Sequence, residues 1–202
     1  MSSLDSRQKQ LLLDVARRAL IVAVERHESL GNLPEEAAFC EHAGAFVTLR
    51  CRSRLRGCIG QMNSHEPLVK IVAEAAKSAA LEDPRFDPVR PDELAGIDIE
   101  LSVVSPPEDI APGQIETGKH GLIISRGWRR GVLLPQVATE CRWEGPRFLE
   151  ETCLKAGLAR DAWKDAETRI QAFTAEVFDE LGFQAPGAPA GGRIGPRYSI
   201  ST

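Results

Sequence analysis

Strict alternation of apolar and polar residues at positions 97–103 constrains the fold of this chain most strongly. Isoleucine, leucine and valine occupy every second position, and aspartate, glutamate and serine stand between them. Side chains of a β-strand point alternately to its two faces, so this pattern predicts a strand with one apolar and one polar face. Two prolines at 106–107 end the pattern.

Several other segments indicate hairpins. Residues 45–51 and 55–60 are typical of two strands joined by a short turn, and residues 122–125 and 132–134 flank a polar hairpin loop. Apolar residues also alternate within 169–178, which we interpret as a further strand.

Three segments, at residues 11–23, 68–79 and 148–156, carry the apolar spacing of amphipathic helices. Asp5 or Ser6 is suited to cap the first of them. Helices and strands are interspersed without regular alternation, and hairpins dominate. We therefore predict an α+β fold with antiparallel sheets rather than a parallel doubly wound fold.

Composition is that of an ordinary globular protein. The chain has 202 residues, of which 43% are hydrophobic and 27% charged, and its formal net charge is −4. The acidic balance disfavours a general role in nucleic-acid binding. No apolar run approaches the roughly 18 to 20 residues that cross a bilayer. Since the N-terminus lacks a signal-peptide pattern, we expect a cytoplasmic protein without membrane contact.

Cysteine usage agrees with that expectation. The five cysteines are an odd number and form no C-x-x-C pair, and no two histidines are spaced as His-x-x-x-His. Free thiols in a reducing compartment are the simplest interpretation. The spacing predicts no local zinc site, and we expect neither a bound metal nor a cofactor.

The hexapeptide Leu55–Gly60 carries the main functional hypothesis. In an extended strand, Leu55 and Ile59 point to one face, and Arg56 and Cys58 point to the other. The α-carbons of Arg56 and Cys58 then stand about 7 Å apart, given roughly 3.3 Å of rise per residue. A guanidinium at that distance favours the thiolate, which is the nucleophilic form of cysteine.

Two glycines flank this cysteine. A glycine in a strand usually marks a bulge or a close approach of backbone or ligand, so Gly57 and Gly60 would leave the surface of Cys58 open. A structural alternative remains, because free cysteine is among the most buried residue types and packs as a small hydrophobe.

A cysteine nucleophile normally needs a base. His120 is the best candidate because it stands at the entry to a predicted strand, although a solvated turn histidine explains it equally well. His65, beside the start of a helix, is the second candidate. In the structural alternative, Arg56 would simply pair with Glu74 or Asp83.

The predicted loop around Trp128 combines an aromatic residue with arginines on both sides. Such a tip could contact an anionic partner or stack on a base. Hairpin tips are often charged for solubility, and that interpretation is favoured here.

Leu55-Arg56-Gly57-Cys58-Ile59-Gly60 resembles the signature hexapeptide of the AMMECR-type domain family, whose bacterial and archaeal members are called AmmeMemoRadiSam system protein A. Further segments resemble that family in the same order, at residues 83–86, 99–103, 120–122, 133–137 and 173–178. The likeness runs from the first helix to about Phe183.

The resemblance implies a domain over residues 1–183, with a larger lobe built from both chain ends and a smaller lobe inserted at roughly 84–146. Each lobe would hold an antiparallel sheet with flanking helices, and the hexapeptide would line a cleft between the lobes. A Memo-type protein and a radical-SAM enzyme are the implied partners, while the family's activity is unassigned. Residues 184–202 fall outside the likeness, and their Gly/Pro-rich composition predicts a flexible tail.

Two functions remain open. In the first, the chain is an enzyme with Cys58 as nucleophile or redox thiol and His120 as acid or base. In the second, it is a non-catalytic module that binds a protein or peptide, and Cys58 is a packing residue. The ligand expected in the cleft is a peptide or a small molecule. The residues predicted to contact the substrate or ligand are Arg56, Gly57, Gly60, Glu74 and Arg85.

Overall fold

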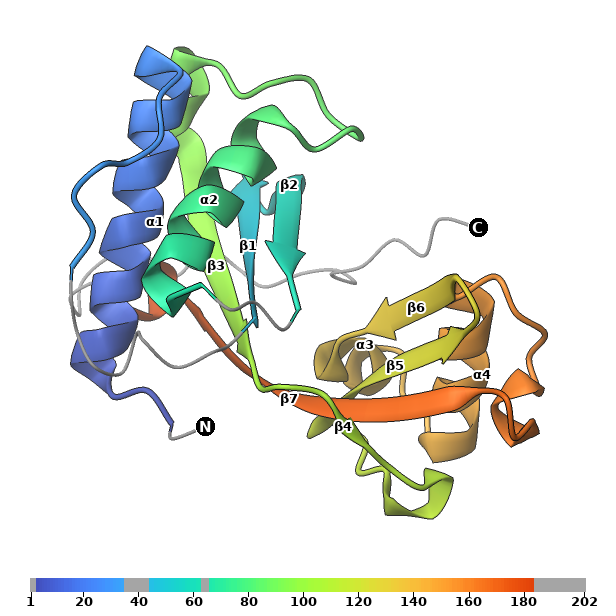
Figure 1. Cartoon of the computed structure of the whole chain (residues 1–202). Coiled ribbons are helices and arrows are strands. Elements are labelled where there is room, and N and C mark those ends of the chain that lie inside the picture. Colours follow the sequence, from blue (N-terminus) through green and yellow to red (C-terminus); the bar gives the residue numbers. More distant parts are fainter. Residues whose placement is uncertain (1–2, 35–43, 63–65, 184–202) are drawn as a thin grey trace. The chain divides into compact units, whose positions relative to one another are not determined.

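The computed structural model describes residues 3–34, 44–62 and 66–183, and the chain divides into two compact units. The first unit holds the described residues of Met1–Pro106 and Glu176–Gly192, and the second is Pro107–Ala175. Each unit combines helices with antiparallel strands (Figure 1), so the predicted α+β class is confirmed. The predicted tail and His65 lie outside the described residues.

Two helices form one layer of the first unit. α1 (Ser6–Arg26) begins after Asp5, whose carboxylate accepts the Gln8 amide at 2.8 Å while the Gln8 side chain accepts the Asp5 amide at 2.9 Å. This capping box satisfies two amides at the helix start, so Asp5 is the cap of the two residues predicted. α2 (Leu68–Leu81) packs beside α1, and alanines make up much of its buried face.

Three antiparallel strands form the other layer, in the order β2 (Arg54–Gln61), β1 (Gly44–Cys51) and β3 (Ile97–Val104). Figure 1 shows α1 and α2 covering one face of these strands. The strand residues that build the core beneath the helices are fully buried: Val47, Leu49, Ile99 and Leu101. β2 is the edge strand, and the short helix η2 (Pro91–Gly96) leads into β3.

Two polar residues of β3 are buried as well. Glu100 and Ser102 are only 6% and 2% exposed, so much of the polar face that the alternation predicted is covered. β3 pairs with β1, which places Thr48 beside Glu100 and Phe46 beside Ser102 on the same face of the sheet. The alternation therefore predicted the strand correctly, but not the burial of its second face.

A β-bulge interrupts β2 at Arg56. Leu49 pairs with Gly57 whereas Arg50 pairs with Leu55, so Arg56 is the extra residue without a partner on β1. A bulge shifts the alternation of side chains by one position. Leu55 pairs with Arg50 and therefore shares a face of the strand with Cys58, which pairs with Thr48. The prediction that Leu55 shares a face with Ile59 was wrong.

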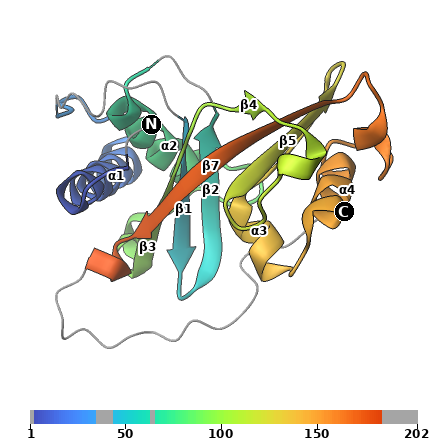
Figure 2. The ribbon, with the colours of Figure 1, turned by 90° about the horizontal axis from the view of Figure 1, so that it is seen from below.

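The second unit is built on three long strands, β5 (His120–Arg126), β6 (Arg129–Leu133) and the first part of β7 (Arg169–Asp179). The middle strand of the three is β5. The other edge of β7 pairs with the two-residue β4 (Glu108–Asp109), as Figure 2 shows. Pairing of β5 with β6 continues to Arg126 and Arg129, so the hairpin loop holds only Gly127 and Trp128. The loop is therefore shorter than the one predicted for residues 126–131.

Helices α3 (Pro135–Glu140) and α4 (Gly145–Lys155) belong to the same unit, together with the short helices η3 (Pro112–Gln114) and η4 (Ala162–Lys164). α4 packs against β6 and β5 and contributes Phe148, Leu149 and Cys153 to the core. The buried residues of that core include Leu122, Ile124, Phe148, Leu149 and Ile170.

The end of β7 returns to the first unit, where η5 (Leu181–Phe183) follows it. Phe178 joins the core beneath α1. Glu176 binds the Lys9 ammonium at 2.6 Å, and Glu180 pairs with Arg17. Ion pairs and apolar packing thus join the two ends of the described chain within one unit.

The compact second unit runs from 107 to 175, whereas the family resemblance implied an inserted lobe at roughly 84–146. Residues 84–106 stay with the first unit because β3 pairs with β1 and Val89 enters the core of that unit. Residues 147–175 belong to the second unit because α4 and the first part of β7 both contribute buried residues to its core.

The described part of the chain carries neither a membrane-spanning helix nor a metal-binding cluster. None of the helices there is long and apolar enough to cross a membrane. No group of three or more His, Cys, Asp and Glu side chains there is arranged to hold a metal ion.

Candidate functional site

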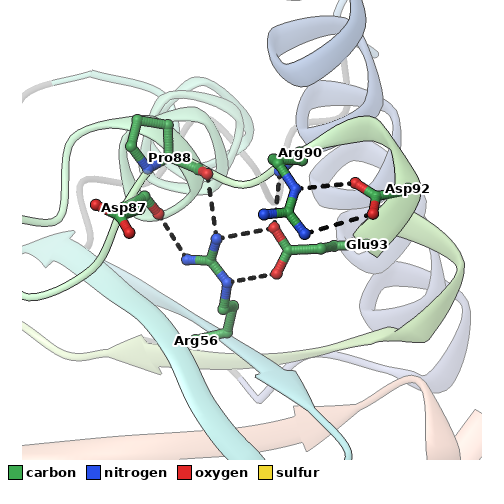
Figure 3. Close-up of polar contacts among 6 residues, drawn as sticks. All are labelled: Arg56, Asp87, Pro88, Arg90, Asp92 and Glu93. Carbon is green, nitrogen blue, oxygen red and sulfur yellow. Dashed lines mark hydrogen bonds and ion pairs between the residues drawn. The ribbon is translucent and has the colours of Figure 1, made fainter.

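Arg56 is held in a dense set of hydrogen bonds at the bulge in β2 (Figure 3). Its Nε and Nη2 donate to the two carboxylate oxygens of Glu93 at 2.8 and 3.0 Å. Nη1 donates to the Asp87 carbonyl at 2.8 Å, and Nη2 also donates to the Pro88 carbonyl at 3.2 Å. Arg56 therefore fastens the segment between α2 and β3 to the edge strand.

The charges of this cluster support one another. The hydrogen bond from Arg56 lowers the pKa of Glu93 to about 2, and the Arg90 amide adds to the effect. The same hydrogen bond raises the pKa of Arg56. The partner of Arg56 is thus Glu93, rather than the Glu74 or Asp83 of the structural alternative, and the guanidinium is committed to binding the protein itself.

A second cluster surrounds Cys58. Its amide donates to Asp83 Oδ2 at 2.8 Å, and its carbonyl accepts from Arg85 Nη2 at 3.2 Å. Asp83 and Arg85 bind each other through Nε–Oδ1 at 2.9 Å and Nη2–Oδ2 at 2.6 Å. On the neighbouring strand, the Thr48 hydroxyl donates to Cys58 Sγ at 3.3 Å. Asp83 and Arg85 therefore bind the amide and the carbonyl of Cys58 at the open edge of β2, as the backbone of a further strand would.

Asp83 is the electrostatic centre of this cluster. It is 4% exposed, and hydrogen bonds from the Arg85 side chain lower its pKa to about 2, with help from the Cys58 and Arg85 amides and against the effect of burial. The Arg85 pKa is raised, mainly by the hydrogen bond to Asp83 and to a lesser degree by Cys58. The cation beside the cysteine is therefore Arg85.

Both glycines of the hexapeptide lie against neighbouring backbone. A β-carbon on Gly57 would stand 2.0 Å from the Ala79 carbonyl oxygen of α2, and one on Gly60 would stand 2.2 Å from the Ala45 carbonyl oxygen. Glycine at these positions lets backbone segments approach closely. Close packing accounts for Gly57 and Gly60, and Cys58 between them is half-buried.

Among the described residues, the contacts of Glu74 and His120, the other two predicted site residues, do not include Cys58. Glu74 is an exposed residue of α2 and takes no part in the hydrogen bonds described around Cys58. His120 begins β5 in the second unit, and its Nδ1 accepts the Glu116 amide at 3.1 Å, which closes the preceding turn. This contact gives the imidazole a local structural role.

Two residues of the cluster around Cys58 were not predicted as site residues from the sequence: Thr48 and Asp83. Thr48 stands on the strand face opposite the core, where a hydroxyl is available to a cross-strand neighbour. Asp83 precedes Arg85 by two residues just after a helix, a spacing at which their side chains can bind. Neither signal is strong without knowledge of the pairing between β1 and β2.

Comparison with known families shows to which family the chain belongs. The sequence model of the family described as AMMECR1 matches residues 13–178. The chain belongs to the AMMECR1 family. The resemblance inferred from the hexapeptide is confirmed, and the match spans both clusters.

Relatives of this chain occur in archaea and bacteria. A protein of Methanothermobacter thermautotrophicus is 46% identical over 180 residues, covering 85% of this chain and 93% of that protein. A protein of Aquifex aeolicus is 40% identical, covering 84% and 91%. The crystal structure of an uncharacterised protein from Pyrococcus horikoshii superposes on this chain with a TM-score of 0.77. Its sequence is 39% identical, and the match covers 83% of this chain and 89% of that one.

Acid is expected to weaken the AMMECR1 fold through Asp83 and Glu93. Both have pKa values near 2 in the folded state, below their ordinary values of 3.8 and 4.5. A carboxylate whose pKa is lower in the folded than in the unfolded state stabilises the fold at any pH above its unfolded pKa. This stabilisation is lost as the pH falls from about 4.5 to about 2. For the buried Asp83 the contribution at neutral pH is about 2 kcal/mol.

This expectation is checked with urea unfolding of the wild type and of Asp83→Asn between neutral and acid pH. Unfolding is followed by hydrogen exchange of β2 peptides, because the three tryptophans lie in the second unit. Asp83→Asn should unfold more easily at neutral pH and show a flatter pH dependence, while Glu74→Gln should behave as wild type. A wild-type pH slope in Asp83→Asn would contradict the assignment.

Proposed function

We propose that the protein is a thiol-dependent enzyme in which Cys58 is the nucleophile and Arg85 binds an anionic group of the substrate. One observation carries the proposal: the thiol of Cys58 accepts the Thr48 hydroxyl at 3.3 Å, and the Arg85 guanidinium binds the carbonyl of the same residue at 3.2 Å. A hydroxyl that donates to the sulfur and a cation close to the residue are features of sites that use a cysteine nucleophile.

The surroundings of Cys58 differ from those of Cys141 and Cys153. Cys153 is fully buried, and burial raises its pKa. Cys141 is exposed, but desolvation and the charges of Glu140 and Glu151 raise its pKa. Cys58 combines partial exposure with a cation and a hydroxyl donor, which is the microenvironment typical of reactive thiols.

The cluster also holds the thiol in place. The Cys58 backbone is fixed on both sides, by Asp83 at its amide and by Arg85 at its carbonyl. The bonds of Arg85 use Nε and Nη2 and leave Nη1 outside the pair with Asp83. The Arg85 side chain is 53% exposed, so Nη1 is placed to hold a carboxylate or phosphate group.

Alkylation rates test this proposal with Cys141 as an internal control. At neutral pH, Cys58 is expected to react with iodoacetamide several-fold faster than the more exposed Cys141, as measured by mass spectrometry of each peptide. Thr48→Val should slow Cys58 by up to about tenfold, which corresponds to roughly 1.4 kcal/mol, and should leave Cys141 unchanged. A wild-type Cys58 that reacts no faster than Cys141 would rule out an activated thiol.

The role of Arg85 is tested with an anionic reagent. Iodoacetate carries a carboxylate, so its rate relative to iodoacetamide should be higher at Cys58 than at Cys141. Arg85→Lys should keep much of this preference, because it keeps the charge, and Arg85→Gln should abolish it. An unchanged preference in Arg85→Gln would remove Arg85 from the proposal while leaving Cys58 in it.

A specific observation favours the second function, a binding module. Arg56, Gly57 and Gly60 all have structural contacts, so much of the hexapeptide is accounted for without chemistry. In that case Cys58→Ala would keep the partner interaction, for which a Memo-type protein and a radical-SAM enzyme are the first candidates to test. Loss of cellular function in a folded Cys58→Ala protein would instead support the enzyme.

A further inference from the structure

We propose that Glu100 takes up the thiol proton of Cys58 through the hydroxyl group of Thr48. The three residues lie side by side on β3, β2 and β1, and we refer to them as the cross-strand row. Because β1 separates β3 from β2, Glu100 acts on the sulfur through Thr48 and is a positioning residue. This inference rests on the proposed function, in which Cys58 is the nucleophile.

Strand pairing places the three side chains of the row next to one another. Thr48 pairs with Cys58 on one side and with Glu100 on the other, and both pairings are antiparallel. Directly opposite residues of such a pair point to the same face, with β-carbons about 4.5 to 5.5 Å apart. The Thr48 hydroxyl contacts Cys58 Sγ at 3.3 Å. A glutamate side chain is long enough to bring its carboxyl group to the same hydroxyl from the other side.

Buried polar side chains gather around the cross-strand row. Four of the six buried polar residues in the described chain lie in it or next to it: Thr48, Asp83, Glu100 and Ser102. The other two belong to the second unit. Burying a carboxyl group is costly unless it is paired or hydrogen-bonded. The burial of Glu100 next to a contact between a hydroxyl and a thiol therefore favours a chemical role for its carboxyl group.

The proposed proton transfer balances within the row. In the resting form, the Cys58 thiol donates to Thr48 Oγ1 and the Thr48 hydroxyl donates to the Glu100 carboxylate. The thiol proton then moves to Oγ1 while the hydroxyl proton moves to Glu100, and the sulfur keeps the electron pair of its S–H bond. Afterwards the Thr48 hydroxyl donates to the sulfur, which is the direction of the contact described above. A hydroxyl serves both forms because it has one hydrogen and two lone pairs.

The carboxylates of β7, which borders β3, and of the segment after α2 have partners of their own. The pairs are Glu176 with Lys9, Glu180 with Arg17 and Asp83 with Arg85, and Asp179 accepts the Gly182 amide. Asp98 is the carboxyl group most like Glu100, because it lies on the same face of β3, two residues away and opposite Arg50. Burial raises the pKa of Asp98. Asp98 therefore provides a matched control for Glu100.

The sign of a substitution at Glu100 separates proton uptake from a simple effect of charge. A carboxylate that only repels a thiolate makes the sulfur less reactive, so its replacement by a neutral amide would speed up alkylation. A carboxylate that accepts the thiol proton has the opposite effect, because its replacement leaves the sulfur protonated. Glu100→Gln is therefore expected to slow the alkylation of Cys58.

The proposal is tested by the pH dependence of alkylation in the full-length protein, with iodoacetamide as the probe and Cys141 as the internal control. The wild-type rate at Cys58 should change little between pH 6 and pH 8, because the proton stays within the row. Glu100→Gln should lower this rate by at least about tenfold at pH 6 and make it rise steeply with pH. Asp98→Asn should keep the wild-type profile.

The part played by Thr48 is tested in the same way. Thr48→Ser keeps a hydroxyl group and should keep the wild-type profile, whereas Thr48→Val should lose it. When Thr48→Val is already present, adding Glu100→Gln should cause no further loss, because the path for the proton is already broken. Hydrogen exchange of β2 peptides shows whether each variant is folded.

Three results would overturn the role of Glu100. The first is a Glu100→Gln variant that keeps or increases the Cys58 rate, and the second is an Asp98→Asn variant that loses as much as Glu100→Gln. The third needs no variant: a wild-type rate at Cys58 that falls with pH as steeply as the rate at Cys141. If Cys58 still reacts faster than Cys141 at neutral pH, only the role of Glu100 is lost. If it does not, the proposed function itself fails.

Discussion

Gly57→Ala should destabilise the first unit by about 3 kcal/mol or more, because the new methyl group would meet the backbone of α2. The distance from an ideal β-carbon at position 57 to the Ala79 carbonyl oxygen is 2.0 Å. A flexible side chain could move away, but a helix backbone can move only with the whole helix. The variant should lower the midpoint of urea unfolding measured by hydrogen exchange of β2.

The reason lies in the packing of α2 on the sheet. Gly57 pairs with Leu49, a fully buried core residue, and therefore faces the helix layer. Ala75, Ala76 and Ala79 line the buried face of α2, and small residues on both sides let helix and strand approach closely. Moving α2 outward would open cavities around Leu49, and such cavities are costly.

Gly31→Ala is the matched control for this prediction. Its β-carbon would meet no atom within 4 Å, and it belongs to the same unit. The control should leave the unfolding midpoint close to that of the wild type. If Gly57→Ala were as stable as the control, the glycine would have no packing role, and its place in the hexapeptide would need a different explanation.

The elements of the fold were largely predictable because their patterns are local. Alternation over 97–103 is visible within seven residues, and β3 lies there. The cap at Asp5 needs only the next few residues. The burial of Glu100 could not be predicted, because it depends on a neighbouring strand that is distant in the sequence.

The candidate site was less predictable because its geometry is set by contacts distant in the sequence. The bulge at Arg56 depends on how β2 pairs with β1. The partner of Arg56, Glu93, lies 37 residues further along the chain. From the hexapeptide alone, Arg56 was the obvious cation for Cys58, whereas the structure brings in Arg85, which is 27 residues away from Cys58.

Arg56→Gln should also destabilise the first unit strongly, by about 3 kcal/mol, because it removes one partner of a largely buried ion pair. Arg56 and Glu93 side chains are 15% and 20% exposed. The substitution would leave the Glu93 carboxylate without its main partner and would release the carbonyls of Asp87 and Pro88. Arg56→Lys keeps the charge but not the forked geometry, so its effect should be intermediate.

Arg90→Gln is the control within the same cluster (Figure 3). Arg90 and Asp92 are both 71% exposed, and exposed pairs contribute little to stability, so this variant should unfold like the wild type. A double variant with Arg56→Gln and Glu93→Gln should lose less stability than the two single variants added together, because the remaining amides are uncharged. Additive losses would mean that Arg56 stabilises the fold through contacts other than the pair with Glu93.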